Sequence, residues 1–415
     1  MTDKTMAPAV APGGSWHLPL AVIMLCGSLI VALSFGVRSA FGLFMVPISG
    51  ELGWGREIFA LSIALQNLLW GLGQPFAGAL ADRFGSMKVL IAGGLLYSAG
   101  VLLMSASTTP ALFHLSTGVL VGFGLSGTGF SIVLAAVGKV VAPEKRSWAL
   151  GIVTAAGSFG QFAMVPLGQA FLSAYGWQTT VLILGISSLA MLPLALAFRG
   201  VGQGGAAGPV NTQSLGQALR EASRHKGFLL LTAGFFVCGF HVAFIAAHLP
   251  SFVIDRGLDP LLGAWALGLV GLFNVIGSYT AGVLGGKFTK KYLLSYLYVA
   301  RSVVIVLFIS FPMTATTVLL FAAAMGLLWL STVPLTSGIV AQVFGPKYMS
   351  MLTGIVFFSH QIGSFLGVWG GGYLYDTTGS YDIVWYCSIA LGIFAGIVHW
   401  PIDERPVIRP VEAKA

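Results

Sequence analysis

Uninterrupted apolar runs of about 20 residues constrain this chain most, because a helix of that length crosses the hydrocarbon core of a membrane. Of the 415 residues, 56% are hydrophobic and 8% are charged, whereas a soluble domain carries about 25% charged residues. A backbone in lipid must satisfy its hydrogen bonds internally, so each run is expected to be a helix. The sequence therefore predicts an all-α integral membrane protein that spans the lipid bilayer several times.

The apolar runs predict twelve transmembrane helices in two sets of six. The expected spans lie near 18–47, 58–80, 88–107, 111–138, 146–174 and 177–198, then near 228–253, 261–286, 292–311, 315–343, 350–374 and 382–401. Segment 199–227 contains no such run and is expected to be a linker, and its weakly amphipathic part around Leu215–Ser223 allows a short helix on the membrane surface. Residues 1–17 and 402–415 are expected to be tails.

The positions of the basic residues predict the orientation, because cytoplasmic loops of membrane proteins are enriched in Lys and Arg. With both termini in the cytoplasm, only Arg56 and Arg256 of the 21 lysines and arginines fall in outer loops, and Arg38 and Arg301 lie within spans. We therefore expect a multi-pass protein of the cytoplasmic (inner) membrane. The net charge of +8 is spread over these loops, so no nucleic-acid partner is expected.

The two sets of six spans repeat each other in sequence. GALADRFGSMK at 78–88 follows the second span, and GVLGGKFTKK at 282–291 follows the eighth, 204 residues later. Residues 149–153 and 352–356 match at the openings of spans five and eleven, at an offset of 203 residues. A parallel six-plus-six repeat is typical of one large class of secondary transporters. It predicts two pseudo-symmetric bundles, 18–198 and 228–401.

The residues that would support other chemistry are not arranged for it. The three cysteines, Cys26, Cys238 and Cys387, have no metal-ligand spacing. The sequence contains no recognisable pairing of a nucleophile with a base. We expect no cofactor, no metal and no enzymatic activity.

The motif Gly78-Ala79-Leu80-Ala81-Asp82-Arg83-Phe84-Gly85 resembles the loop between spans two and three of the major facilitator superfamily. In that family the Asp and Arg of the loop tie the cytoplasmic helix ends together in the outward-open state. The resemblance implies a gating role for Gly78, Asp82, Arg83 and Gly85. The second copy of the motif lacks the acid.

A narrower resemblance links the chain to bacterial monocarboxylate and oxalate:formate-type carriers. Phe41-Gly42-Leu43-Phe44 and Glu51-Leu52-Gly53-Trp54-Gly55-Arg56 are similar to the segment after their first span. Arg38 lies where monocarboxylate transporters carry a lysine, on a span that lines the central cavity of the family. The chain departs from the animal carriers in span eight, which lacks their Asp and Arg. The resemblance implies a small organic anion as the substrate.

Arg38 and Arg301 are charges held inside apolar runs that contain no Asp or Glu. A charge at the bilayer centre costs about 2.5–3.5 kcal/mol on insertion scales. A guanidinium binds a carboxylate through two parallel hydrogen bonds. We therefore expect Arg38 to bind an anion. Arg301 lies on span nine, an outer helix of the family, where substrate contact and a structural role remain alternatives.

Other polar residues at mid-depth complete the expected site. His241 and His360 are the candidates for proton coupling, because imidazole gains and loses a proton near neutral pH; a packing role is the alternative for each. Uncharged candidates for substrate binding are Gln161, Asn274, Tyr279 and Gln361. Such residues also form hydrogen bonds between helices without contacting a substrate.

Together these features predict a monomeric secondary transporter of small organic anions, namely monocarboxylates or related carboxylates. Alternating access would be driven by a co-transported proton or by exchange. A drug or cation exporter of the same superfamily is the alternative. Such pumps usually bind the cation through a carboxylate within the membrane, and the interiors of the spans here contain none. Their Gly-Pro motif on span five is also only partial here, as Gly157, Gly160 and Pro166. A membrane sensor or enzyme is a third, weaker alternative.

Overall fold

The computed structural model describes residues 18–142, 145–201, 214–345 and 348–407, and these contain helices but no strand. The expected tail 1–17, residues 202–213 of the linker and the end of the second tail lie outside this part of the chain. The first half consists of α1 (Leu20–Ser39), η1 (Phe41–Phe44), α2 (Met45–Leu52), α3 (Arg56–Phe84), α4 (Ser86–Ser105), α5 (Pro110–Phe113), the π-helical η2 (His114–Leu120), α6 (Val121–Thr128), α7 (Phe130–Val140), α8 (Arg146–Ser188), α9 (Met191–Ala195) and η4 (Leu196–Phe198). After it come α10 (Leu215–Arg224), α11 (Lys226–Asp255), α12 (Pro260–Lys287), α13 (Lys290–Ser310), α14 (Ala315–Leu328), α15 (Thr332–Phe344), α16 (Met349–Thr378) and α17 (Asp382–His399).

Within the described residues, ten helical segments are long and apolar enough to cross a membrane. Two features account for the difference from twelve. The segment Trp148–Phe198 counts once, although Gly176, with φ of 75°, divides α8 at a kink. Helix α3 is 29 residues long but is not among these ten apolar segments. The polar residues Gln66, Asn67 and Gln74 lie within it and lower its hydropathy.

Helix α10 forms where the sequence allowed a short helix between the two halves. Ser214 caps its N-terminus by accepting a hydrogen bond from the Gln217 backbone, and Gln217 caps Ser214 in return. Ala218 and Ala222 are buried while the polar face is exposed. The helix is therefore amphipathic and packs one side against the second half.

The two halves repeat in three dimensions at the spacing seen in the sequence. The Ser34 and Thr128 hydroxyls lie 3.2 Å apart in the first half. The Cys238 sulfur and the Thr332 hydroxyl lie 3.2 Å apart in the second, each residue 204 positions further along the chain. The α6–α7 helix is interrupted at Gly129, and the α14–α15 helix is interrupted between residues 328 and 332. The inner helices of both halves thus have the same construction.

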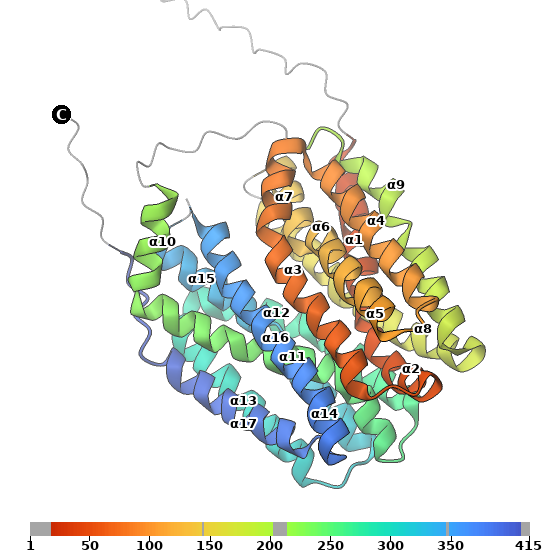
Figure 1. Cartoon of the computed structure of the whole chain (residues 1–415). Coiled ribbons are helices and arrows are strands. Elements are labelled where there is room, and N and C mark those ends of the chain that lie inside the picture. The colour runs from red at the N-terminus through yellow and green to blue at the C-terminus, as the bar shows by residue number, and fades with distance from the viewer. Residues whose placement is uncertain (1–17, 143–144, 202–213, 346–347, 408–415) are drawn as a thin grey trace, which may run out of the picture.

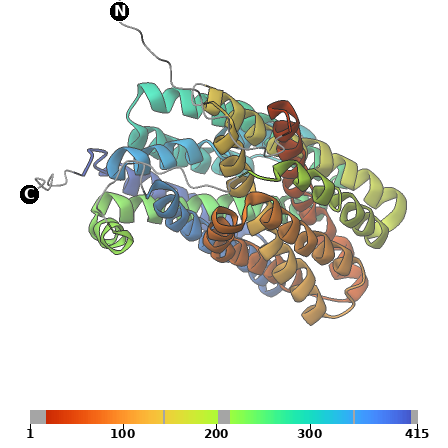
Figure 2. The same ribbon diagram turned by 90° about the horizontal axis from the view of Figure 1, so that it is seen from above.

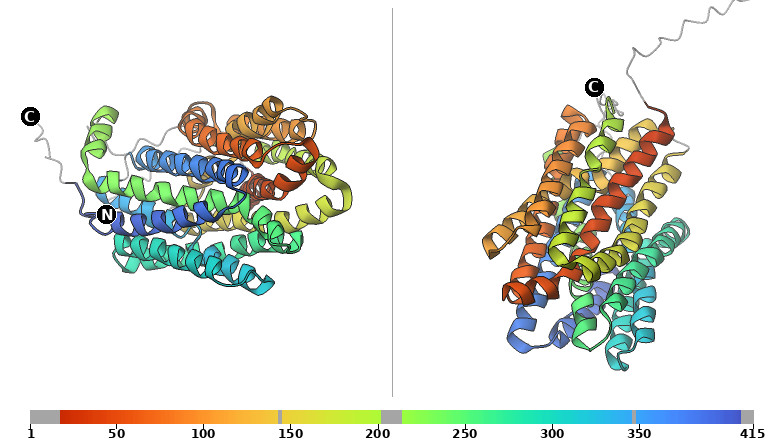
Figure 3. Two further views of the ribbon diagram at one scale, coloured as in Figure 1. Left: turned by 60° about the horizontal axis from the view of Figure 1, so that its bottom comes forward. Right: turned by 90° about the vertical axis from the view of Figure 1, so that its right-hand side faces the viewer.

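Most of the contact between the halves comes from two helix pairs, α3 with α16 and α8 with α12, and η1 and α2 also contact α11. Figures 2 and 3 show the two halves lying beside each other. In Figure 1, α3 and α16 converge toward the end of the molecule where α3 begins. Because Arg56 is the first residue of α3, we call this the Arg56 end. The opposite end, which contains α10, is called the α10 end.

Glycine surroundings differ between these two ends. At Gly71 a Cβ would lie 2.8 Å from the Gln361 side chain, and at Gly372 it would lie 2.6 Å from Ala60. Nearer the α10 end, Gly78 of α3 and Gly354 of α16 have no neighbouring atom within 4 Å of such a Cβ in the described part of the chain. The structure is thus closed at the Arg56 end and splayed at the α10 end.

Candidate functional site

Arg38 lies in the last turn of α1, between the two halves of the molecule. Together with residues of α3 and α11 it borders a cavity of about 20 Å³, which is enough for a single water molecule. The cavity is lined by Arg38, Ser39, Phe41, Gly42, Ile63, Gln66, Asn67, Ala243, Ala246 and Ala247. First-half polar groups therefore face small apolar side chains of the second half.

The local sequence explains how Arg38 comes to lie against α11. Helix α1 ends at Ser39 and continues as a 3-10 turn, Phe41–Phe44. Within that turn a Cβ on Gly42 would collide with backbone oxygens of α11, at 3.0 Å for Ala247. Only glycine lets the two backbones approach so closely.

The guanidinium of Arg38 has few partners. One terminal nitrogen donates to Oδ1 of Asn67 at 2.5 Å, and Nδ2 of Asn67 donates to the Ile63 carbonyl at 2.8 Å. Nε of Arg38 is buried and has no hydrogen-bond partner among the residues that the structure describes. Its Cζ lies 5.3 Å from the centre of the Trp70 ring.

No ion pair joins Arg38 to any carboxylate in the described ranges. Opposite charges attract more strongly away from bulk water, because the effective dielectric constant is lower there. An unpaired guanidinium with an unused N–H can therefore hold an anion, and it would gain the hydrogen bonds that it lacks.

Gln161 and Asn274 form hydrogen bonds that cross between the halves. Nε2 of Gln161 on α8 donates to the Leu267 carbonyl on α12 at 2.9 Å. Nδ2 of Asn274 on α12 donates to the Ser158 hydroxyl at 3.0 Å, while its Oδ1 accepts from the Leu330 backbone at 3.0 Å. In this conformation both side chains join helices, away from the Arg38 cavity.

Arg301 is fully buried inside the second half. Its Nε donates to the Leu328 carbonyl at 3.1 Å, and a terminal nitrogen donates to the Leu328 and Trp329 carbonyls. These carbonyls lie where the α14–α15 helix is interrupted and have lost their usual helical donors. Arg301 thus supplies hydrogen-bond donors to the free carbonyls at the end of α14. Its second terminal nitrogen has no partner within the described ranges.

The two candidate histidines have different surroundings. His241 is fully buried, and its Nε2 lies 2.7 Å from the Ser388 carbonyl on α17, inside the second half. His360 on α16 is 8% exposed, and its ring stacks on Phe357 with centroids 5.6 Å apart. Because Phe357 contacts Trp70 of the first half, His360 is close to the interface and His241 is not.

The remaining predicted residues are spread over several places. Gln361 neighbours His360 and packs against Gly71 across the interface. Tyr279 on α12 is 75% exposed. Asp82 accepts from Lys139 at 2.8 Å, so in this splayed conformation its ion pair stays within the first half. Gly85 ends α3 with φ of 89°, which is why glycine is needed there.

Sequence reasoning missed the contacts at the Arg56 end. Arg56 of the first half forms two hydrogen bonds with Asp255 of the second, at 2.6 and 2.7 Å. The Asp376 carboxylate accepts the backbone N–H groups of Arg56 and Glu57 at 3.0 and 2.8 Å. The only signal in the sequence was that Arg56 and Arg256 are the basic residues outside the expected cytoplasmic loops.

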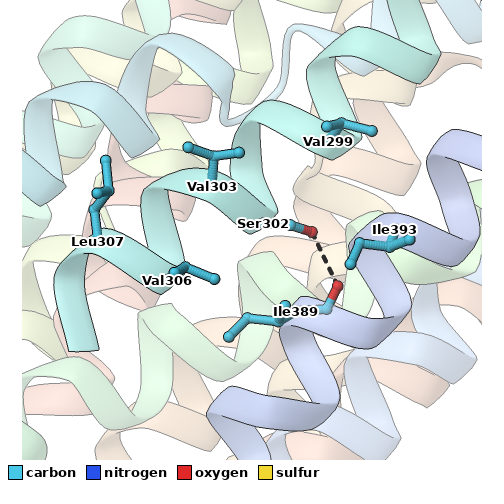
Figure 4. A pocket seen from close by; sticks show the side chains of 7 residues that line it. All are labelled: Val299, Ser302, Val303, Val306, Leu307, Ile389 and Ile393. Carbon is cyan, nitrogen blue, oxygen red and sulfur yellow. Dashed lines mark hydrogen bonds between the residues drawn. The ribbon is translucent and has the colours of Figure 1, made fainter. Parts of the chain in front are cut away.

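A larger cavity, of about 230 Å³, lies between α13 and α17 on the outside of the second half. Figure 4 shows that aliphatic side chains line it. Ser302 is the one polar side chain among the described residues that line it, and its hydroxyl donates to the Ile389 carbonyl at 3.0 Å. A cavity with no unused polar group offers nothing to a charged ligand. The Arg38 cavity is therefore the candidate site.

Comparison with known proteins places the chain among transporters. The chain is 28% identical over 391 residues to an uncharacterized MFS-type transporter, YcxA, of Bacillus subtilis, covering 89% of this chain and 91% of that protein. It is 27% identical to monocarboxylate transporter 13 of Bos taurus, covering 97% and 94% of the two chains. A crystal structure of a bacterial homolog of the human lysosomal transporter Spinster, described as inward-facing and occupied, matches with a TM-score of 0.68 and 14% identity, over 92% of this chain and 96% of that one.

The Spinster-like structure shares the fold. The relatives in sequence are named as transporters, and the similarity extends over nearly their whole length. The family model of the Major Facilitator Superfamily matches residues 27–368. Both results agree with the apolar helices and the repeated halves. The chain is a multi-pass membrane transporter of a small-molecule substrate, not an enzyme, and it belongs to the major facilitator superfamily.

Proposed function

We propose that this protein is a secondary transporter of small organic anions, monocarboxylates or related carboxylates, and that Arg38 binds the carboxylate. The observation that carries the proposal is the half-buried Arg38 guanidinium between the two halves, with an unused N–H and no carboxylate partner in the described residues. The similarity to monocarboxylate transporters supports the same substrate class.

The proposed transport cycle moves the halves 18–198 and 228–401 against each other. With both termini in the cytoplasm of the cell and the protein in its inner membrane, the α10 end faces the cytoplasm and the conformation described here is inward-facing. The glycine-rich faces of α3 and α16 would separate at the Arg56 end as the α10 end closes. In that closed state Asp82 and Arg83 would hold the α10 end together, with Gly78 and Gly85 allowing the close approach.

The proposed driving force is a co-transported proton or exchange of one anion for another, in a protein that works as a monomer. His360 and His241 are the proposed proton carriers, since a guanidinium stays protonated at working pH. Gln161, Asn274, Tyr279 and Gln361 are proposed to contact the substrate at some stage of the cycle, when the halves have moved apart.

The test compares variants of Arg38 in proteoliposomes. We expect Arg38→Gln to abolish uptake of every accepted carboxylate. Arg38→Lys should retain part of it, because lysine keeps the positive charge but lacks the planar pair of N–H donors that binds both carboxylate oxygens. Arg256→Gln is the matched control, because it removes one positive charge from an exposed outer position. Wild-type uptake by Arg38→Gln would refute the site, and transport of lipophilic cations in place of carboxylates would refute the substrate class.

A further inference from the structure

Aromatic rings surround the approach to Arg38 from the splayed α10 end. The Phe35 ring lies 5.7 Å from Trp70 and 4.1 Å from Phe130, measured between ring centroids. Across the interface, the Phe357 ring lies 5.2 Å from Trp70, edge to face. Three elements of the first half and one of the second therefore contribute to a single group of rings, Phe35, Trp70, Phe130 and Phe357, which we call the ring group.

The helix directions place the ring group on the open side of Arg38. Helix α1 runs from the α10 end toward the Arg56 end, so Phe35 precedes Arg38 by three residues, or about 4.5 Å along the axis. Helix α3 runs the opposite way, and Trp70 follows Asn67, the partner of Arg38, by three residues. A ligand entering from the α10 end reaches the ring group before it reaches the guanidinium.

The ring group presents π-faces and edges more than hydrogen-bonding groups. The single polar ring atom, Nε1 of Trp70, already donates to Gln74 at 3.0 Å. Phe35, Phe130 and Phe357 are only partly buried. Beyond Phe357 the stacked His360 ring extends the aromatic surface into the second half.

The contact between Trp70 and Phe357 is also a contact between the halves. Aromatic pairs favour centroid distances of about 4.5–7 Å in edge-to-face or offset arrangements. A flat ring entering between Trp70 and Phe357 would replace one ring contact with two. Its carboxylate could then reach the guanidinium, whose Cζ is 5.3 Å from the Trp70 ring.

We propose that the substrate is an aromatic monocarboxylate, whose ring lies in the ring group while its carboxylate binds Arg38. This inference rests on the proposed function and specifies it further. A short aliphatic acid such as acetate would bury almost nothing against these rings. A benzene ring adds apolar area and ring contacts, which together favour the aromatic acid by about tenfold or more.

The test measures binding by isothermal titration calorimetry to the purified full-length protein in detergent. Three probes are used: benzoate, cyclohexanecarboxylate and acetate. We expect benzoate to bind about tenfold or more tightly than acetate, and about threefold more tightly than cyclohexanecarboxylate, which has a ring without π-faces. Equal affinities for benzoate and acetate would overturn the inference, and equal affinities for the two ring acids would overturn the aromatic selectivity.

Two variants test the location of the ring. Trp70→Leu and Phe357→Leu should each reduce the preference for benzoate over acetate to about threefold or less. Trp400→Leu, a half-exposed tryptophan at the end of α17, is the control and should change neither affinity. If the two variants weaken all three acids equally, the ring does not lie there.

The same measurements separate this inference from the proposed function. Arg38→Gln should lose binding of all three acids. If acids bind in an Arg38-dependent way with no preference for a ring, only the aromatic inference fails. If none of the acids binds the wild-type protein, or if Arg38→Gln binds them normally, the proposed function fails as well.

Discussion

The Arg56 guanidinium of the first half donates two hydrogen bonds, of 2.6 and 2.7 Å, to the Asp255 carboxylate of the second. The Arg56 guanidinium also lies over the Tyr375 ring, 3.8 Å from its centroid. Next to it, the Asp376 carboxylate accepts two backbone N–H groups at the N-terminus of α3, where a negative charge is stabilised by the helix dipole. The closed Arg56 end is thus held by charged contacts that cross between the halves.

Removing these contacts should open the Arg56 end. We expect the double variant Asp255→Asn, Asp376→Asn to favour separation of the halves there by about 2 kcal/mol or more, since breaking partly buried charge pairs across an interface costs about 2–5 kcal/mol. Hydrogen–deuterium exchange should increase in peptides 52–60 and 370–380. Asp382→Asn is the control, because its pair with Arg256 is exposed, 3.9 Å long and within one half. Unchanged exchange in the double variant would mean that apolar packing alone closes this end.

Arg301 should matter for stability more than Arg38 does. Arg301→Gln leaves the Leu328 and Trp329 carbonyls without their donors, and each buried unsatisfied group costs about 1–3 kcal/mol. We expect a clear fall in Tm for Arg301→Gln and little change for Arg38→Gln, measured by thermal unfolding in detergent. The opposite pattern, a normal Tm for Arg301→Gln combined with lost anion binding, would show that Arg301 contacts the substrate.

The internal repeat explains which parts of the structure could be predicted from the sequence. The spacing of 204 residues that relates the loop motifs also relates the Ser34–Thr128 and Cys238–Thr332 contacts, so the pattern of apolar runs and the repeat were enough to predict the two bundles. By the same spacing Arg301 corresponds to Tyr97, whose hydroxyl donates to the Ser34 carbonyl at 2.8 Å. This correspondence favours an internal role for both residues.

The direction in which each polar side chain points could not be predicted from the sequence. His241 and His360 are both central in their spans, yet one bonds to α17 and the other stacks beside the interface. Rotation of a helix about its axis decides between these outcomes, and it depends on packing against helices far away in sequence. The contacts of Arg56 with Asp255 and Asp376 could not be predicted for the same reason, and they also belong to one conformation of the cycle.

His360 should carry more of any pH dependence than His241. Its ring lies next to Phe357 near the interface, where water can reach it as the halves move, whereas His241 is enclosed by α11 and α17. We expect His360→Gln to abolish the stimulation of uptake by an inward proton gradient while retaining exchange of one anion for another. His241→Gln, the matched control, should keep the stimulation. Loss of stimulation in His241→Gln alone would reverse this assignment, and loss in neither variant would favour anion exchange as the driving force.

Asn274 should couple the first half to the interrupted helix of the second. Its amide donates to the Ser158 hydroxyl and its oxygen accepts the Leu330 N–H, which lies at the interruption between α14 and α15. Asn274→Ala leaves the Leu330 N–H without this acceptor and should destabilise the protein by about 1–3 kcal/mol, whereas Ser158→Ala should cost less. A double-mutant cycle on thermal unfolding should give a coupling energy of about 0.5 kcal/mol or more between these contacting residues. Ser173, whose hydroxyl accepts from Gln169 within α8, provides the control, and Ser173→Ala should add to Asn274→Ala without coupling. Simple additivity of Ser158→Ala and Asn274→Ala would mean that movement of the first half is not transmitted to the interrupted helix through this hydrogen bond.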